Sequence, residues 1–445
     1  MKTLAELSRA LEAGETSSVA LVREALDRIL DPEGQGDRVF TMIDPERSVA
    51  TAERMDALRA AGQAPSPLAG VPVSIKALFD LQGKVTTAGS KVLADAPAAR
   101  EDAPAVARLR EAGMVVMGHT NMTEFAYSGL GLNPHYGTPG SGPDRRHAPG
   151  GSSSGAAVSV AEGMAAMGLG TDTGGSCRIP AAWNGLVGFK PTARRVPTAG
   201  AFPLSQTLDS IGPIARTVED CALADAVLAG EALDGAADVP ALSGLRFAVL
   251  ENYVTGDMTP HVSAAYQAGL KALEAAGASL TSLSLPDLDR LPGLNARGGI
   301  VAAEALAIHR ELLDRRREGY DPRVSIRILK GESLEPGEYE ALLATRAEII
   351  ATADAATAPF DAVLMPTTPM EAPLIAELDR DEAYYGSANL LALRNPTVGN
   401  FLDRCAISVP LPAAGLPVGL MLMGPTMGDR RLLAVARAVE ATLAG

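Results

Sequence analysis

Short apolar runs, rich in β-branched or large aliphatic residues, recur along nearly the whole 445-residue chain, with helix-like segments between them. The runs lie at residues 71–75, 114–117, 245–250, 362–365 and 418–423. Alternating strand and helix signals are typical of an α/β fold with a largely buried sheet. The sequence therefore predicts an α/β protein whose sheet draws strands from most of the chain.

Helix-like patterns fill much of the remaining sequence. Residues 1–60 carry Ala, Leu, Glu and Arg at spacings of three and four, which predicts a helical lead-in. Residues 300–357 predict two long helices joined around 331–337, and residues 430–443 predict a final amphipathic helix. The sequence shows no internal repeat, no charge block and no long flexible linker. We therefore expect a single domain over residues 1–445.

The balance of charge argues against some partners. The chain has 39 Lys and Arg against 53 Asp and Glu, a formal net charge of −14 at pH 7. A field of that sign repels phosphate backbones and anionic lipid surfaces. We expect no direct contact with nucleic acid and none with a membrane.

The cysteines and the apolar stretches indicate a compartment. Cys177, Cys221 and Cys405 are too few and too widely spaced for a disulfide framework or a common zinc pattern. The longest low-charge stretches, 163–170 and 411–424, are shorter than a membrane-spanning helix of about 20 apolar residues. The N-terminal stretch mixes leucines with charged residues, unlike a secretory signal. These features predict a soluble, cytoplasmic protein.

Residues 147–192 hold two glycine-serine turns, at 150–155 and 174–176, on either side of a helix of small residues. Glycine before a helix N-terminus suits phosphate binding, but a P-loop needs Lys and then Ser or Thr after its second glycine. Here Gly155 is followed by Ala156. The pattern therefore argues against nucleotide binding.

Ser176 fits nucleophilic catalysis, because it ends the tight turn Thr173-Gly174-Gly175-Ser176, whose backbone N–H groups can face a developing oxyanion. None of the five histidines occurs in a triad pattern, so another base is needed. Lys76 ends an apolar run, and burial there would lower its pKa from about 10.4 and leave a neutral amine as the base. For Lys76 taken alone, a surface position is the commoner outcome.

Six stretches of the chain carry a family resemblance. They are GVPVSIKALFD at 70–80, GHTNMTEFA at 118–126, GGSSSGAA at 150–157, GTDTGGSCRIPAAWNGLVGFKPT at 170–192, LDSIGP at 208–213 and GLPVGLMLMG at 415–424. These stretches closely resemble the amidase signature family of serine hydrolases, with a core signature region of about 65–215. The resemblance implies the amidase signature fold, an α/β fold with a central mixed β-sheet covered on both faces by helices. It also implies a reaction that needs no cofactor and no metal.

The resemblance further implies roles for individual residues. Ser176 is the nucleophile, Ser152 is the bridging serine held after a cis peptide, and Lys76 is the base. Because a serine hydroxyl both donates and accepts, Ser152 can pass the Ser176 proton toward Lys76 and later return it to a leaving amine. The oxyanion hole is formed by the backbone N–H groups of Thr173, Gly174, Gly175 and Ser176.

Residues around this set have supporting roles by the same resemblance. Asp172 and Arg178 either pair with each other or face solvent, and the resemblance favours a supporting role for both. Ser153 is assigned to support as well, or it caps the helix that follows. We expect Tyr127 and Ser128 to line the acyl pocket, although Tyr127 fits the hydrophobic core equally well.

The chain departs from the family pattern at three places. Many relatives read GGSSGGS where residues 151–156 read GSSSGA, so one glycine is missing. Cys177 replaces a usual aliphatic residue, and because free Cys is usually a small buried hydrophobe, we expect no thiol mechanism. Residues 193–197 read Ala-Arg-Arg-Val-Pro, whereas the A subunit of a tRNA-dependent amidotransferase typically has Tyr-Gly-Arg-Val-Ser there.

The primary hypothesis is hydrolysis of a linear carboxamide C–N bond through a Ser176 acyl-enzyme, which releases ammonia or an amine and a carboxylic acid. One alternative is a glutamine-hydrolysing A subunit of a tRNA-dependent amidotransferase. The other is a catalytically silent scaffold or binding protein. The free-energy cost of burying unpaired Lys and Ser side chains that serve no function argues against this alternative. The expected partner is a small-molecule amide, and a homodimer stays open.

The sequence leaves the identity of the amide open. Arg323, Arg327 and Arg394 are candidate ligands for a substrate carboxylate, although solvation at the surface is the commoner outcome for each. Residues 394–403 somewhat resemble relatives that act on small urea-derived amides.

Overall fold

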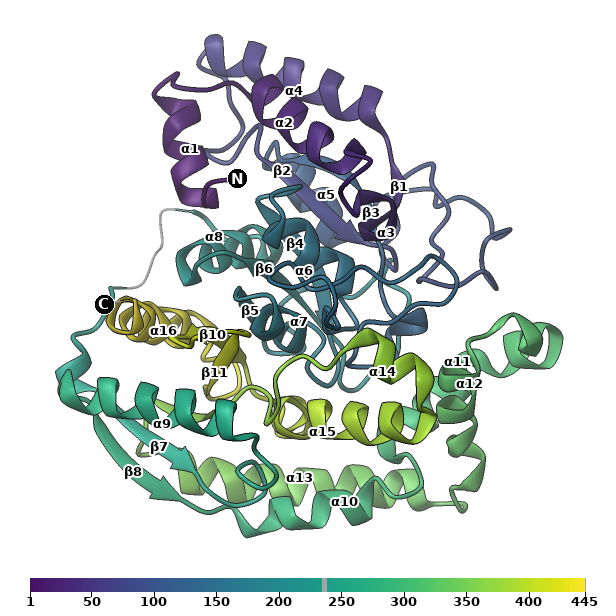
Figure 1. Ribbon diagram of the computed structural model, residues 1–445, viewed down its shortest axis with the longest axis vertical. Coiled ribbons are helices and arrows are strands. Elements are labelled where there is room, and N and C mark those ends of the chain that lie inside the picture. The colour runs from purple at the N-terminus through teal and green to yellow at the C-terminus, as the bar shows by residue number, and fades with distance from the viewer. Residues whose placement is uncertain (234–237, 445) are drawn as a thin grey trace.

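The computed structural model describes residues 1–233 and 238–444, which form a layered α/β structure around one sheet (Figure 1). Within these residues the sheet has eleven strands in the order β1-β3-β2-β4-β6-β5-β10-β11-β9-β7-β8. The strands are β1 (Phe40–Ile43), β2 (Pro72–Lys76), β3 (Val115–Thr120), β4 (Met167–Asp172), β5 (Val187–Lys190), β6 (Ser210–Ala215), β7 (Arg246–Leu250), β8 (Ser279–Leu283), β9 (Ala362–Pro366), β10 (Ala406–Leu411) and β11 (Val418–Met423).

Parallel and antiparallel pairs both occur in the sheet. Strand β2 runs parallel to β3 and β4, and β7 runs parallel to β8 and β9. The central strands from β4 through β6, β5, β10 and β11 to β9 are joined by antiparallel pairs. The predicted central mixed sheet is confirmed.

Helices enclose the sheet. They are α1 (Leu4–Glu12), α2 (Ser18–Leu30), α3 (Gly36–Val39), α4 (Pro45–Ala60), α5 (Pro104–Glu111), α6 (Ser154–Ala161), α7 (Arg178–Trp183), α8 (Val218–Ala229), α9 (Pro260–Ala275), α10 (Leu291–Leu294), α11 (Gly299–Arg316), α12 (Pro322–Leu329), α13 (Glu338–Thr357), α14 (Ile375–Arg380), α15 (Glu382–Phe401) and α16 (Asp429–Leu443). In Figure 1, α1, α2 and α4 lie at one end of the molecule, and α9, α13, β7 and β8 lie at the other.

The alternation of side chains along the strands shows that both faces of the sheet are covered. In β4, Met167 and Leu169 join the main hydrophobic core, to which α5, α8, α9 and α16 also contribute, whereas a Cβ on Gly168 would touch Ala156 of α6. In β11, Leu420 joins the same core, and a Cβ on Gly419 would touch Ala182 of α7. Because successive residues of a strand face opposite sides, α6 and α7 cover one face and the main core covers the other.

The sequence patterns did not predict the glycine-rich strands. All five predicted runs form strands, but β4, β5 and β6 read MGLGTD, VGFK and SIGPIA, which lack an unbroken β-branched run. Glycine stands there because neighbouring backbone comes close: a Cβ on Gly188 would lie 2.4 Å from the carbonyl oxygen of Cys177, and one on Gly212 would lie 2.1 Å from that of Phe189. Strands of this kind carry little of the signal on which sequence prediction depends.

The helical lead-in is confirmed with one correction. Helices α1 to α4 occupy most of residues 1–60, and the Ser17 hydroxyl caps α2 by accepting a hydrogen bond from the backbone N–H of Ala20. The short strand β1 interrupts them and pairs antiparallel with β3 at the edge of the sheet.

The prediction of two long helices over 300–357 is wrong in number. This segment folds as α11, α12 and α13, with short 3-10 turns between them. The extra break comes at Asp321-Pro322, because Pro322 opens α12 while the Asp321 side chain caps that helix through the backbone N–H of Arg323 at 2.9 Å. The final predicted helix is confirmed as α16.

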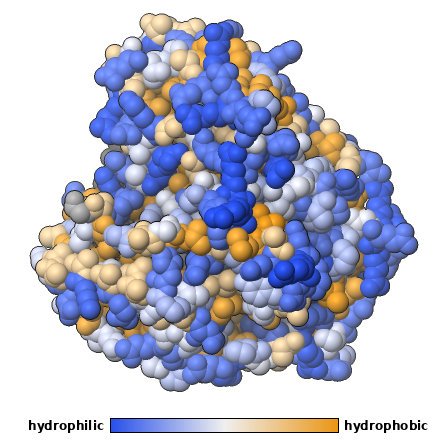
Figure 2. Space-filling view, in the orientation of Figure 1, coloured by the Kyte–Doolittle hydropathy of each residue, from blue (hydrophilic) through white to orange (hydrophobic). Residues whose placement is uncertain are grey.

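The surface carries no large apolar band on the face seen in Figure 2, where hydrophobic residues form small groups among hydrophilic ones. The exposed large hydrophobic side chains are those of Leu30 in α2, Ile326 in α12 and Leu390 in α15, together with Val239 and Met427, which lie outside helices and strands. Among the described helices, none combines the length and the hydropathy needed to cross a membrane.

Gly188→Ala tests the packing of α7 against β5. The new Cβ would meet the Cys177 carbonyl oxygen at 2.4 Å and the Ala181 Cβ at 2.6 Å, so backbone must move. We expect the free energy of unfolding to fall by roughly 1–3 kcal/mol, measured by urea denaturation. Gly244→Ala is the matched control, because a Cβ there meets nothing within 4 Å. If Gly188→Ala and Gly244→Ala have the same free energy of unfolding, the close approach of Gly188 to the Cys177 carbonyl oxygen is contradicted.

Candidate active site

Lys76 is a fully buried lysine at the end of β2. Strands β3 and β4 flank β2 on either side, so the whole strand is buried. The Lys76 Nζ donates hydrogen bonds to the Ser152 Oγ at 2.7 Å and to the Thr171 Oγ1 at 2.8 Å. Burial lowers the pKa of Lys76 to about 8, although the nearby acidic groups, among them Asp209, partly offset this effect.

Ser152 lies two residues before the first residue of α6, and its peptide bond with Gly151 is cis. Its side chain is fully buried. Its carbonyl oxygen accepts a hydrogen bond from the backbone N–H of Thr123 at 3.1 Å, and the Gly151 N–H donates to the Gly129 carbonyl oxygen at 2.8 Å. A Cβ on Gly151 would lie 2.6 Å from the backbone nitrogen of Gly131, so the close approach of these two segments requires glycine.

Ser176 lies on the loop between β4 and α7, and 3% of its surface is exposed. Its carbonyl oxygen accepts a hydrogen bond from the Ser153 N–H at 3.3 Å, so the two glycine-serine turns lie side by side. Gly175 before it has φ = +127°, and a Cβ there would meet Pro396 at 2.6 Å. Within residues 1–233 and 238–444, no hydrogen bond joins the Ser176 hydroxyl to Ser152 or Lys76.

Asp172 and Arg178 form a buried ion pair at the two ends of this loop. The Arg178 Nη2 donates to Oδ1 at 2.8 Å and its Nε donates to Oδ2 at 3.0 Å. The Asn400 amide joins them, because it donates to the Asp172 Oδ1 at 3.0 Å and accepts from the Arg178 Nη2 at 2.7 Å. Burial alone would raise the pKa of Asp172, but the Arg178 guanidinium outweighs burial and holds that pKa well below its usual range.

The Asp172 carboxylate also fixes the loop backbone. It accepts hydrogen bonds from the N–H of Gly175 at 2.8 Å and of Cys177 at 3.1 Å. The Gly175 N–H is therefore already engaged, whereas the expected oxyanion hole requires it to face the substrate. The other three expected donors are the backbone N–H groups of Thr173, Gly174 and Ser176.

Ser153, the remaining predicted supporting residue, and Cys177 are both fully buried. The Ser153 hydroxyl donates to the Thr171 carbonyl oxygen at 3.3 Å and makes no capping bond to α6. Cys177 is fully buried, its Sγ lies 3.6 Å from the Gly212 carbonyl oxygen, and burial raises the pKa of this thiol above its usual range. The thiol therefore stays protonated and packs as a small apolar group.

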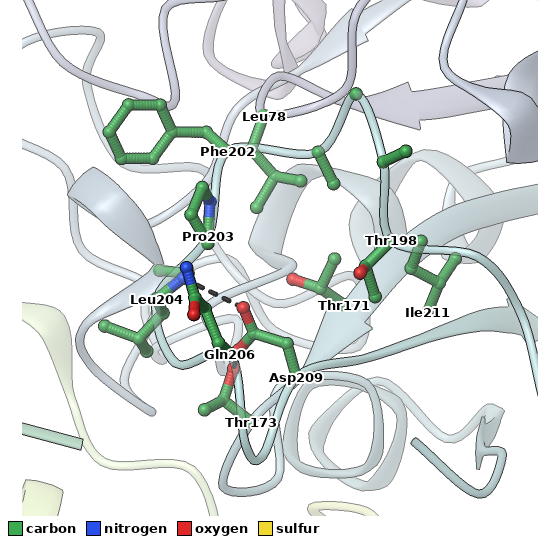
Figure 3. A pocket seen from close by; sticks show the side chains of 14 residues that line it. Leu78, Thr171, Thr173, Thr198, Phe202, Pro203, Leu204, Gln206, Asp209 and Ile211 are labelled. Atoms are coloured by element: carbon green, nitrogen blue, oxygen red, sulfur yellow. Dashed lines mark hydrogen bonds between the residues drawn. The ribbon is translucent and has the colours of Figure 1, made fainter. Parts of the chain in front are cut away.

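A cavity of about 400 Å³ adjoins this set (Figure 3). Two of its lining residues are close to this set in the chain or by contact: Thr171 is the hydroxyl partner of Lys76, and Thr173 lies on the Ser176 loop. Its fourteen lining residues are Leu78, Ala126, Thr171, Thr173, Thr198, Ala199, Gly200, Ala201, Phe202, Pro203, Leu204, Gln206, Asp209 and Ile211. Most of the wall therefore comes from residues 198–211, which the sequence patterns did not assign to the site.

Asp209 is the charged residue in this wall, and it follows directly on Leu208 in the LDSIGP motif. Its Oδ1 accepts a hydrogen bond from the Thr173 hydroxyl at 2.5 Å, and its Oδ2 accepts from the N–H groups of Leu204 at 2.9 Å and Ser205 at 3.1 Å. Burial raises the pKa of Asp209 to about 6, against the effect of these hydrogen bonds. The LDSIGP motif marks Asp209 as a residue of interest in the sequence. Only the fold shows that its carboxylate lies at the cavity.

Tyr127 and Ser128 are buried but are absent from the fourteen lining residues. The Tyr127 ring lies under the Arg327 guanidinium, 4.5 Å from ring centroid to Cζ, and its carbonyl oxygen accepts from Arg327 at 2.7 Å. The Ser128 hydroxyl donates to the Asn389 Oδ1 and accepts from the Tyr385 hydroxyl, both at 2.9 Å. Their role in an acyl pocket stays a prediction.

The three candidate carboxylate-binding arginines have other partners. Arg323 pairs with Glu382 at 2.6 Å and stacks on Tyr385, Arg327 contacts Tyr127, and Arg394 donates to the Val254 carbonyl oxygen at 2.9 Å. None of the three lines the cavity. Across the described part of the chain, no group of three or more His, Cys, Asp or Glu residues is arranged to hold a metal ion.

Comparisons with known proteins agree with this geometry. A family model described as Amidase matches residues 20–433. The chain is 37% identical to 2-amino-5-chloromuconic acid deaminase from Comamonas testosteroni, over 99% of this chain and 96% of that protein. It is 35% identical to the A subunit of glutamyl-tRNA(Gln) amidotransferase from Ralstonia nicotianae, over 98% of this chain and 97% of that protein. A crystal structure of an amidase superimposes with a TM-score of 0.89 and 34% identity, over 99% of this chain and all of the other.

Arg178→Met tests the buried ion pair. The variant leaves the Asp172 carboxylate buried without its cation, so we expect the free energy of unfolding to fall by about 3–5 kcal/mol in urea denaturation. The double variant Asp172→Asn/Arg178→Met removes the unpaired charge and should recover part of that loss. A change below about 1 kcal/mol in the single variant would contradict the structural role of the pair.

Proposed function

The chain belongs to the amidase family of hydrolases, which act on amide C–N bonds, and on this premise we propose that it hydrolyses a small linear carboxamide through an acyl-enzyme on Ser176. The products are a carboxylic acid and ammonia or an amine. One observation carries the proposal: the buried Lys76 Nζ lies 2.7 Å from the Ser152 hydroxyl, in the turn next to the Ser176 loop.

The first step is the attack of Ser176 on the amide carbonyl carbon. Neutral Lys76 takes the proton of the Ser152 hydroxyl, and the Ser152 oxygen takes the proton of the Ser176 hydroxyl. The Ser176 oxygen then bonds to the carbonyl carbon, and the carbonyl oxygen becomes an oxyanion. The lowered pKa of Lys76 supports this role, because an appreciable share of the amine is neutral near pH 7 to 8.

Backbone donors stabilise the oxyanion. The N–H groups of Thr173, Gly174 and Ser176 are the proposed donors, and the Gly175 N–H contributes by orienting the loop through Asp172. A single oxyanion donor is worth about 2.7–4 kcal/mol of transition-state stabilisation in comparable sites. The Asp172–Arg178 pair is the support on which the position of these donors depends.

Breakdown of the tetrahedral adduct returns the proton. Lys76 in its protonated form gives a proton to Ser152, and Ser152 gives its own to the amide nitrogen as the C–N bond breaks. This return is needed because an unprotonated amide nitrogen is a very poor leaving group. Water then attacks the ester carbon with the same relay as base, and Ser176 is released with the carboxylic acid.

A glutamine-hydrolysing A subunit of a tRNA-dependent amidotransferase is the second candidate. The 35% identity to a protein of that kind over nearly the whole chain favours it. The sequence Ala-Arg-Arg-Val-Pro at 193–197 weighs against it, because such proteins typically have Tyr-Gly-Arg-Val-Ser there. Copurification of a tRNA-binding partner with the chain at stoichiometric yield would favour this candidate over the stand-alone amidase.

A silent scaffold is the third candidate, and the burial of Lys76, Ser152 and Ser176 weighs against it. We also propose that the protein acts in the cytoplasm on a small molecule. Its three cysteines are unpaired and buried, which suits a reducing compartment.

Turnover of a panel of amides tests the proposal directly. Ammonia release from acetamide, benzamide, malonamate, glutamine, indoleacetamide and biuret should be detectable for at least one amide. Ser176→Ala and Lys76→Ala should each lower its kcat by at least about a thousandfold, because the relay acts as a unit. Lys91→Ala, at an exposed lysine, is the matched control and should keep full activity. Full activity in Ser176→Ala would refute the proposed nucleophile.

The pH dependence of turnover tests Lys76 as the base. Only the neutral amine accepts the proton, so kcat/KM should rise with pH up to about 8 and level off above it. Below about pH 7 the fall should approach tenfold per pH unit, and steady-state kinetics from pH 5.5 to 9.5 measure it. A profile that stays flat between pH 6 and 9, or falls with rising pH, would contradict the assignment.

A further inference from the structure

Helix α15 packs against the Ser176 loop at Pro396. A Cβ on Gly175 would lie 2.6 Å from the Pro396 Cβ, so the helix and the loop are in direct contact there. Pro396 lies inside the helix, where it lacks the N–H that other helix residues donate. Its carbonyl oxygen accepts a hydrogen bond from the Arg178 Nη1 at 2.8 Å. At this point α15 is therefore joined both to the loop and to α7.

Thr397, the next residue of α15, donates its hydroxyl to the Ser176 loop and not to its own helix. Threonine hydroxyls inside helices often donate to the carbonyl oxygen four residues earlier. Four helix threonines of this chain make that bond, namely Thr51, Thr352, Thr357 and Thr442. The Thr397 Oγ1 instead donates to the Gly174 carbonyl oxygen at 3.3 Å. The Thr397 hydroxyl therefore links α15 to the loop.

The peptide group between Gly174 and Gly175 is held at both of its ends. Its carbonyl oxygen accepts from the Thr397 hydroxyl, and its N–H donates to the Asp172 Oδ1 at 2.8 Å. Glycine has no Cβ and adopts positive and negative φ about equally well, so a peptide between two glycines has little orientation of its own. Gly175 has φ = +127°. The side chains of Thr397 and Asp172 therefore supply the orientation that the two glycines leave open.

This peptide group lies between two of the proposed oxyanion donors. The Gly174 N–H precedes it in the chain and the Ser176 N–H follows it. A donor is effective only when it lies about 2.7–3.1 Å from the oxyanion, so a small displacement of the loop weakens it. Without the Thr397 hydroxyl, the Gly174 carbonyl oxygen loses its partner on α15, and only Asp172 still holds the peptide group.

We propose that Thr397 is a positioning residue: its hydroxyl holds the Gly174 carbonyl oxygen so that the N–H groups of Gly174 and Ser176 stay in place for the oxyanion. This inference rests on the proposed amidase function. Apolar packing at the same place comes from other residues of α15, because a Cβ on Gly174 would lie 3.6 Å from the Leu393 Cδ2 and one on Gly175 would touch Pro396. The contribution of Thr397 is therefore its directed hydrogen bond.

Thr397→Val and Thr397→Ser test the hydroxyl. Valine keeps the branched shape and a similar helix propensity but cannot donate, whereas serine keeps the hydroxyl. For the amide that the wild type turns over best, we expect kcat of Thr397→Val to fall at least about fivefold while KM stays within about twofold, because the donors act mainly in the transition state. Thr397→Ser should keep at least about half of the wild-type kcat. Thr352→Val, which removes an exposed hydroxyl from α13, is the matched control and should keep full activity.

Two further measurements separate positioning from a general loss of structure. Hydrogen exchange of the backbone amides in residues 171–177, followed by mass spectrometry, should be faster in Thr397→Val than in the wild type and unchanged in Thr397→Ser. The pH profile of kcat/KM should still level off at about pH 8 in both variants, because the hydroxyl partners of Lys76 are not altered. Urea denaturation reports whether each variant folds, and Thr397→Ala is the second hydroxyl-free variant if Thr397→Val does not.

The outcomes separate this inference from the proposed function. Wild-type kcat and wild-type exchange in Thr397→Val, with Ser176→Ala inactive, would overturn the role of Thr397 while the amidase mechanism stands. A loss confined to KM, or an equal loss of kcat in Thr397→Ser, would also overturn it. Faster exchange in Thr397→Val alone, with no amide turned over by the wild type, would support the contact between Thr397 and the Ser176 loop and count against the proposed hydrolysis.

Discussion

The loop that carries Ser176 depends on the buried ion pair between Asp172 and Arg178. Burying two charges costs more free energy than pairing alone returns, so such a pair is stable only when its remaining donors and acceptors are satisfied. Here each Asp172 oxygen accepts one bond from Arg178 and one from a loop N–H, and Asn400 of α15 contacts both partners. The position of the proposed nucleophile is therefore set jointly by β4, α7 and α15.

Arg178 and Lys76 are both fully buried near the Ser176 loop, but their hydrogen-bond partners differ. Arg178 faces a carboxylate and remains charged. Lys76 donates to the hydroxyls of Ser152 and Thr171, neither of which carries a charge, so burial lowers its pKa to about 8. Both cations are buried, but Arg178 has a carboxylate as its partner, whereas the proposed base Lys76 has, among the described residues, only hydroxyl partners within hydrogen-bond distance.

Features that depend on local sequence could be predicted, and features assembled from distant segments could not. The glycine-serine turns and the Lys76 strand end each depend on residues that are neighbours in the chain. The glycine-rich strands were missed because their glycines are required by close contact with the backbone of α6, of β5 and of the residue before α7, all of which are distant in the sequence. The cavity wall at 198–211 and the contact of Asn400 with Asp172 depend on segments that only the folded sheet brings together. No local sequence pattern therefore predicts them.

Covalent labelling tests most directly whether Ser176 is a nucleophile activated by Lys76. The protein would be treated with a fluorophosphonate, and the adduct would be located by peptide mass spectrometry in the wild type and in Lys76→Ala. We expect one adduct, on Ser176, whose rate of formation rises with pH up to about 8, and we expect no such adduct in the folded Lys76→Ala variant. An adduct on another residue, or equal labelling of the variant, would contradict it.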